Sequence, residues 1–373
     1  MRMKKLLFAT CCIAFLSGSL GAAAQKKSAA KNVLAQTLEG KSWSADNGNG
    51  TFTNPLFYDE FSDPDIIRVG EDYYLAGTTM HSVPGLVVLH SKDLVNWEFS
   101  SYCFDRFDDS DDFNLRNDKE AYGQGIWAPA IRYHNGKFYI FSNINGHGLQ
   151  VYISDSAKGP WTHHKVNGDI YDLSVLFDED GKIYAVHKYG NVTVTELKPD
   201  LSGPVEGSSK VVIPEGNAMG EGHHVYKING MYYILSADYS PMGRMQCARS
   251  KSIWGPYETC VISERESYGY AAGWSVGNMG IGRPLPEDGF KFQNNKPNGV
   301  KLGCATIHQG GIVQAPDGKW WGVSMQDFNA VGRTVCLSPI TWVDGWPYFG
   351  LEKNLGRSPR TWFKPNDMVK TPQ

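Results

Sequence analysis

The feature that most constrains the fold is a hairpin pattern that recurs along the chain. Each copy has a β-rich run, a tight turn that contains glycine, and a second run that is rich in aromatic residues. Asn-Gly and Asp-Gly between β-rich runs are strong hairpin signals, because both turn residues need a positive φ. The turns lie at Gly70-Glu71, Asn135-Gly136, Asp180-Gly181, Asn229-Gly230 and Asp317-Gly318. This spacing predicts a repeat architecture built from hairpins.

A second strand pair completes each unit, because another strand leads to a charged turn followed by Trp or Tyr. Examples end at Trp97, Trp161, Tyr257 and Trp346, and the copy around Lys198 is degenerate. Two hairpins give four strands, and five such units fit a chain of 373 residues with 41 glycines and 13% aromatic residues. We therefore predict an all-β fold, a five-bladed β-propeller over residues 51–350. The alternative is a β-sandwich with similar hairpins.

The first 24 residues have the pattern of a signal peptide. Three basic residues in the first five positions precede an apolar run over 6–20, and three alanines at 22–24 form a cleavage site. We predict an exported protein, periplasmic or extracellular, with no membrane segment beyond this signal. Cys11 and Cys12 leave a lipoprotein as the less favoured alternative. Residues 25–50 are predicted to be a linker and residues 351–373 a C-terminal tail.

Charge and cysteine content exclude some classes of function. Without its three N-terminal basic residues the chain carries a formal charge of −6 rather than −3 and has no basic stripe, which argues against nucleic acid as a partner. Five cysteines remain, with wide spacings and no CxxC pair, so structural zinc is not supported. Export permits a Cys247–Cys260 disulfide, although we expect isolated buried thiols.

Three acidic residues stand at corresponding places in the repeat, each just before a hairpin: Asp63, Asp172 and Glu221. In a propeller the innermost strands run along the axis, so residues at equivalent strand starts converge at one end of the channel. Three carboxylates that meet there repel one another, and at least one should keep its proton near neutral pH. Glycoside hydrolysis uses such acid and base pairs. An Asp before Pro is also common as a turn residue, so this prediction depends on the blades.

At these residues the sequence resembles glycoside hydrolase family 43. The motifs are Asp63-Pro64-Asp65-Ile66 after Asn54-Pro55, Asp172-Leu173-Ser174-Val175-Leu176-Phe177, and Glu221-Gly222-His223-His224. The resemblance covers about residues 54–350 and implies a five-bladed propeller and hydrolysis with inversion. It also implies that Asp63 is the general base, that Glu221 is the general acid, and that Asp172 orients the acid and tunes its pKa.

Two residues depart from the family pattern. Asp65 replaces the usual Ser, and we expect it either to raise the pKa of Asp63 from the same strand face or to face solvent. His223 replaces a Pro beside Glu221, and we expect it to form a hydrogen bond at the site.

Four further residues are predicted to bind substrate. Trp127 is expected to stack on a sugar, unless it is a core residue. Arg333 is expected to bind sugar hydroxyls or to pair with a catalytic carboxylate. His81 stands where xylosidases of the family often carry aromatic residues. His308 resembles the family histidine on the axis, where a cation, Ca²⁺, is sometimes held, although a lone His is more often a core residue.

The sequence therefore favours an inverting glycosidase that releases a terminal xylose or L-arabinose from plant cell-wall polysaccharides or oligosaccharides. It needs no cofactor, and its partner is carbohydrate. A fructan-cleaving hydrolase is one alternative, although its Asn-Asp-Pro-Asn-Gly start is absent here. The other alternative is a non-catalytic, secreted, carbohydrate-binding propeller.

Overall fold

The structure is a computed structural model that describes residues 44–107, 110–168, 170–217, 219–239, 242–263, 308–327, 331–357 and 361–365. The predicted signal peptide, most of the predicted linker and Cys304 lie outside these residues. All the named elements in the described residues are strands. None of the described segments is a helix of the length and hydropathy needed to cross a membrane.

Five antiparallel sheets, here called blades 1 to 5, follow one another along the chain. Blade 1 contains β2 (Ser62–Val69), β3 (Asp72–Thr78), β4 (Gly85–Ser91) and β5 (Trp97–Phe104). Blade 2 contains β6 (Ala130–His134), β7 (Lys137–Ile144), β8 (Gly148–Ser154) and β9 (Thr162–Val166). Blade 3 contains β10 (Ser174–Phe177), β11 (Ile183–His187), β12 (Val192–Leu197) and β13 (Lys210–Ile213).

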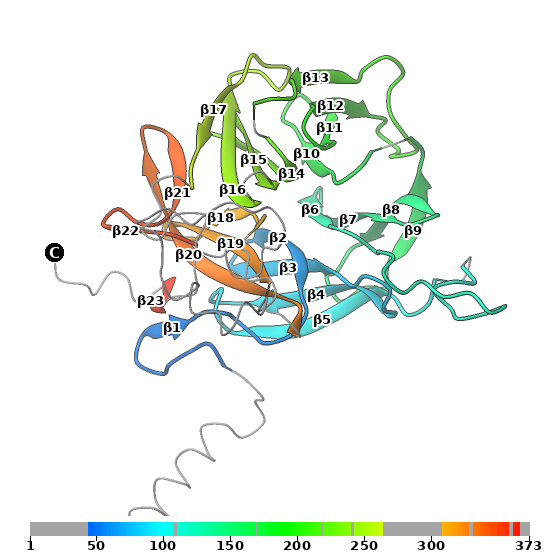
Figure 1. Cartoon of the computed structure of the whole chain (residues 1–373), viewed down its shortest axis with the longest axis horizontal. Coiled ribbons are helices and arrows are strands. Elements are labelled where there is room, and N and C mark those ends of the chain that lie inside the picture. Colours follow the sequence, from blue (N-terminus) through cyan, green and yellow to red (C-terminus); the bar gives the residue numbers. More distant parts are fainter. Residues whose placement is uncertain are drawn as a thin grey trace, which may run out of the picture. The chain divides into compact units, whose positions relative to one another are not determined.

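Blade 4 contains β14 (Glu221–Ile228), β15 (Met231–Tyr239), β16 (Met242–Ser250) and β17 (Glu258–Val261). Blade 5 has a fifth strand and contains β18 (Ile312–Gln314), β19 (Trp320–Asp327), β20 (Arg333–Val343), β21 (Trp346–Leu351) and β22 (Asn354–Leu355). Figure 1 shows the blades arranged about a common centre, with β2, β6, β10, β14 and β18 innermost. The predicted five-bladed propeller is confirmed, and the sandwich alternative is wrong.

The glycine of each of the five predicted turns adopts the left-handed conformation, and in two of the turns both residues adopt it. Asn135 and Gly136 have φ values of 48° and 79°, and Asn229 and Gly230 have 50° and 77°. These Asn-Gly pairs are the two-residue turns that match the twist of antiparallel strands. Each blade is a meander, so all the innermost strands start at the same end of the propeller. Residues at those starts therefore meet, although they lie far apart in sequence.

A short sheet outside the blades joins the two ends of the described chain. β1 (Thr51–Thr53) pairs with β23 (Thr361–Phe363), and Phe52 lies opposite Trp362. Both side chains are buried in the core cluster that includes Trp321 of blade 5. Ala45 is buried in the same cluster. The folded unit therefore extends beyond the predicted propeller boundaries at residues 51 and 350, because packing of both ends covers the apolar edge of blades 1 and 5.

Four cysteines lie in the described residues as free thiols: Cys103, Cys247, Cys260 and Cys336. Cys247 of β16 lies directly opposite Cys260 of β17. All except Cys260 are buried.

We predict that Trp362→Ala destabilises the protein strongly. Its side chain is 4% exposed, and truncation of a buried Trp typically lowers the free energy of unfolding by about 3–5 kcal/mol. Phe363 on the same strand is 44% exposed, so Phe363→Ala should change this free energy by about 0.5 kcal/mol or less. Urea denaturation of both variants measures the difference. Equal effects would contradict a role for β23 in closing the fold.

Candidate active site

The three predicted acids lie at strand starts where the backbone is irregular. Asp63 and Asp172 have φ values of 50° and 51°, and Gly222, beside Glu221, has 63°. Asp tolerates this left-handed region better than most residues. The pairing register also shifts between Ser62 and Asp65 of β2 and between Glu221 and His224 of β14. Such bulges redirect side chains, and here they occur where the acids point into one pocket.

One pocket of about 220 Å³ receives all three acids. It is smaller than the pockets of about 300–1,000 Å³ that bind drug-sized ligands, so its size suits a single sugar ring. Two of the predicted substrate-binding residues, Trp127 and Arg333, also line it. The full lining is Asp63, Trp127, Ala128, Asn143, Tyr171, Asp172, Glu221, Gln309 and Arg333.

Asp63 is held by donors from blade 5 and from its own strand. The Nε2 atom of Gln309 donates to Oδ1 at 2.8 Å, and Nη1 of Arg333 lies 3.3 Å from the same oxygen. The hydroxyl of Ser62 donates to Oδ2 at 3.0 Å. Of the two roles predicted for Arg333, the structure therefore places it on a carboxylate. Asp63 is 8% exposed, so its carboxylate is fixed and still reaches the pocket.

Asp172 is buried close to the other two carboxyl groups of the site, those of Glu221 and Asp63. Burial and the negative charges of Glu221 and Asp63 raise its pKa to about 7, against the opposing effect of a hydrogen bond from the Gly222 N–H at 2.7 Å. A carboxyl with this pKa keeps its proton in mildly acidic solution. The expectation that one of the three acids is protonated near neutral pH agrees with this value.

Glu221 receives support from two neighbours. The hydroxyl of Tyr171 donates to its Oε2 atom at 3.0 Å, and the hydroxyl of Ser236 donates to its backbone oxygen at 3.1 Å. Gly222 is required next to it, because a Cβ atom at this position would lie 2.2 Å from Oε1 of Gln309. The backbone beside the predicted acid is therefore packed against the residue that holds the predicted base.

Asp65 is in neither of the two positions expected for it. Its side chain is 1% exposed and does not line the pocket. Nη1 of Arg132 donates to Oδ2 at 2.5 Å, and Nδ1 of His224 donates to Oδ1 at 3.1 Å. Burial opposes ionisation, but these two partners outweigh it and hold the pKa of Asp65 below its ordinary value. Asp65 is thus a buried ion-pair partner on the axis.

The other predicted residues do not line the pocket. His223 is 3% exposed and donates from Nε2 to the backbone oxygen of Lys188 at 2.6 Å, while burial lowers its pKa to about 4. His81 is exposed and contacts the ring of Tyr122, with ring centroids 5.0 Å apart. His308 is 3% exposed, and its neighbour Gln309 lines the pocket instead.

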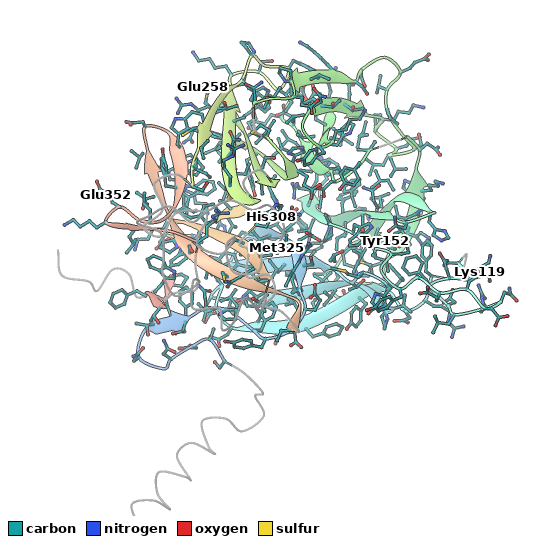
Figure 2. The ribbon with its side chains drawn as sticks, in the orientation of Figure 1. Lys119, Tyr152, Glu258, His308, Met325 and Glu352 are labelled. Carbon is teal, nitrogen blue, oxygen red and sulfur yellow. The ribbon has the colours of Figure 1, made fainter. Side chains whose placement is uncertain are left out.

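The surroundings of His308 do not suit a cation. Figure 2 shows His308 near the centre of the blades close to Met325, whose backbone oxygen accepts its N–H at 2.9 Å. Burial, together with the positive charges of Arg333 and Arg357, lowers the pKa of His308 to about 3. Among the described residues no three His, Cys, Asp or Glu side chains form a metal-binding group. The predicted calcium site stays a prediction.

Four pocket residues were not predicted from the sequence: Ala128, Asn143, Tyr171 and Gln309. Tyr171 directly precedes Asp172, and Gln309 directly follows His308. Their closeness in sequence to predicted site residues was the signal available for these two. Asn143 is the residue before the last one of β7, where no motif marks it, and its amide donates to the Ile170 oxygen at 3.0 Å.

The family model described as "Glycosyl hydrolases family 43" matches residues 52–269. The chain belongs to glycosyl hydrolase family 43.

Relatives within family 43 are similar over most of this chain. A β-xylosidase of Formosa agariphila is 29% identical over 386 residues, covering 92% of this chain and 58% of its own length. A non-reducing end α-L-arabinofuranosidase of Bacteroides ovatus is 34% identical over 316 residues, covering 80% of this chain and 54% of its own. The chain therefore spans little more than half the length of these relatives.

A solved structure shares the fold. It is described as a bifunctional GH43-CE protein of Bacteroides eggerthii, and it superposes with a TM-score of 0.68 at 32% identity. The match covers 84% of this chain and 37% of that protein. The propeller predicted from the family 43 motifs is thus shared with a known member.

We predict that Asp172→Asn stabilises the protein in a pH-dependent way. The folded pKa of Asp172, about 7, lies above the ordinary value of 3.8, so folding favours the protonated form and loses stability as pH rises between these values. The neutral Asn side chain avoids this loss. The gain in melting temperature should be small at about pH 4, grow to about pH 7 and then level off.

Asp178 supplies the control with the opposite sign. Burial opposes its ionisation, but hydrogen bonds from Lys227 and Tyr232 hold its pKa below 3.8. Asp178→Asn should therefore lower the melting temperature at about pH 7, and this loss should shrink in acid. If Asp172→Asn were destabilising at about pH 8, the electrostatic account of the pocket would be wrong.

Proposed function

We propose that this chain is an inverting glycoside hydrolase that releases a terminal xylose or L-arabinose from plant cell-wall polysaccharides or oligosaccharides. The observation that carries the proposal is the meeting of Asp63, Asp172 and Glu221 in one pocket of about 220 Å³. The names of the family relatives, a β-xylosidase and an α-L-arabinofuranosidase, support a pentose as the released sugar. A pocket with room for a single sugar ring also favours attack at a chain end.

Glu221 is proposed as the general acid and Asp63 as the general base. Glu221 protonates the oxygen of the leaving group while Asp63 takes a proton from water on the opposite face of the sugar ring. Gln309 and Arg333 fix the carboxylate of Asp63, as a base that must hold a water in line requires. Asp172 lies beside the acid and accepts the N–H of Gly222 at 2.7 Å, so it orients the segment that carries Glu221.

Export of the protein is also part of this proposal. The N-terminal pattern of basic, apolar and small residues supports delivery to the periplasm or the extracellular space, where polysaccharide fragments are met. The non-catalytic alternative is not favoured, since a mere binding site has no use for three clustered carboxyls, which repel one another. The fructan-cleaving alternative would act through a nucleophile and retain the anomeric configuration.

We expect the first-formed sugar to have the anomeric configuration opposite to that of the substrate. Activation of water by Asp63 is a single displacement, so it inverts the anomeric carbon. Proton NMR during hydrolysis of an aryl β-xyloside or aryl α-L-arabinofuranoside follows the first-formed anomer before mutarotation. Retention would show that Asp63 is a nucleophile and would favour the fructanase-like alternative.

The two acids should respond differently to the leaving group. Glu221→Gln removes the proton donor, so hydrolysis of an oligosaccharide should fall by about 10²–10⁴-fold. An aryl pentoside needs little protonation and should keep more of its rate. Asp63→Asn removes the base, and both substrates should lose activity to a similar extent.

The informative quantity is the ratio of kcat/KM on the aryl pentoside to kcat/KM on the oligosaccharide. A rise confined to Glu221→Gln supports the assignment. If both variants change this ratio equally, or if neither loses more than a few-fold in rate, Asp63 and Glu221 are not the base and the acid.

A further inference from the structure

The position of the general acid determines where the leaving part of the substrate must lie. This inference rests on the proposed function, in which Glu221 protonates the glycosidic oxygen. The leaving sugar is bonded to that oxygen, so it occupies the space beside Glu221 while the terminal sugar occupies the pocket. A surface that recognises the leaving sugar must therefore come from residues next to Glu221.

Two segments border Glu221 at the pocket end of blades 3 and 4. One is the residue before Asp172, Tyr171, whose hydroxyl donates to Oε2 of Glu221. The other is the loop over residues 188–191 between β11 and β12. Ser174 at the start of β10 pairs with Val186 near the end of β11, so this loop emerges at the pocket end.

Backbone hydrogen bonds hold the loop against both catalytic segments. The N–H of Lys188 donates to the oxygen of Tyr171 at 3.0 Å, and the N–H of Gly190 donates to the oxygen of Gly220 at 3.1 Å. The buried His223 ring donates to the oxygen of Lys188 at 2.6 Å. Tyr189 is therefore fixed between the chain segments that lead to Asp172 and to Glu221.

Both tyrosines expose large aromatic side chains at this place. The exposed fraction is 48% for Tyr171 and 49% for Tyr189. Aromatic rings have flat apolar faces, and covering them on binding is favourable. A sugar ring offers a matching apolar face of C–H groups. We propose that Tyr171 and Tyr189 form the subsite for the leaving sugar, so that the protein prefers a sugar over a small alcohol as leaving group.

Tyr171 differs from Tyr189 because it also contacts the acid. Its hydroxyl positions Glu221, and its ring contributes to the subsite. Loss of the hydroxyl alone should slow every substrate that needs protonation, whatever its leaving group. Loss of the Tyr189 ring should slow only substrates whose leaving group has a ring to bind. These two effects can be separated by the choice of substrates.

The experiment compares a disaccharide with the methyl glycoside of the same terminal sugar. The pairs are xylobiose with methyl β-D-xyloside, and α-1,5-L-arabinobiose with methyl α-L-arabinofuranoside. Both members of a pair have an alcohol as leaving group and need the acid, but only the disaccharide has a second ring. The quantity is kcat/KM for the disaccharide divided by kcat/KM for the methyl glycoside.

We expect Tyr189→Ala and Tyr171→Ala each to lower this ratio by about 5–10-fold, the size of one lost ring contact. Tyr171→Phe should lower both rates together and leave the ratio near the wild-type value. Tyr133→Ala is the matched control, because Tyr133 is 43% exposed near the end of β6, away from the pocket. It should change neither rate.

If the wild-type protein hydrolyses both substrates and Tyr189→Ala leaves the ratio unchanged, the subsite is wrong while the proposed function stands. A fall of both rates by the same factor in Tyr189→Ala also overturns the subsite, since it indicates a general disturbance of the acid. If the wild-type protein hydrolyses none of the four substrates, the proposed function itself fails, and the subsite fails with it.

Discussion

The buried carboxylate of Asp65 is the interaction on which the arrangement of the blades depends. It accepts hydrogen bonds from the Ile131 N–H at 2.9 Å, from Arg132 at 2.5 Å and from His224 at 3.1 Å, so it connects blades 1, 2 and 4. Arg132 then reaches blade 3 through the hydroxyl of Ser174 at 2.6 Å. A buried charge without partners is very costly, so these innermost strands are stable only in the register that brings the partners together.

Blade 5 packs directly on this cluster. A Cβ atom on Gly311 would lie 2.6 Å from the hydroxyl of Tyr226, 3.1 Å from Nδ1 of His224 and 3.4 Å from Oδ1 of Asp65. The same Tyr226 hydroxyl accepts the Ile312 N–H at 2.8 Å. Gln309 lies two residues before Gly311, and Asp63 lies two residues before Asp65. The cluster that fixes these strands therefore also fixes the two residues of the Gln309–Asp63 hydrogen bond.

The fold and the three acids could be predicted because their signals are local. Hairpin turns and acids before strands can be recognised within a few residues, and their repetition along the chain predicts a ring of blades. The burial of Asp65 could not be predicted, since its partners Arg132 and His224 are 67 and 159 positions away. The same holds for β23, which pairs with β1 across nearly the whole described chain and so extends the folded unit past residue 350.

Each of the three acids in the pocket has a different neighbour. Asp63 has the positive charge of Arg333, and Glu221 has the neutral hydroxyl of Tyr171. Asp172 has mainly the two other carboxylates, so burial and their charges raise its pKa to about 7. Below this pH Asp172 is mostly neutral, and above it Asp172 adds a negative charge beside Glu221. Acid and base roles in one site require such unequal surroundings. Three carboxyls in equivalent surroundings would have similar pKa values and could not serve separately as acid and base.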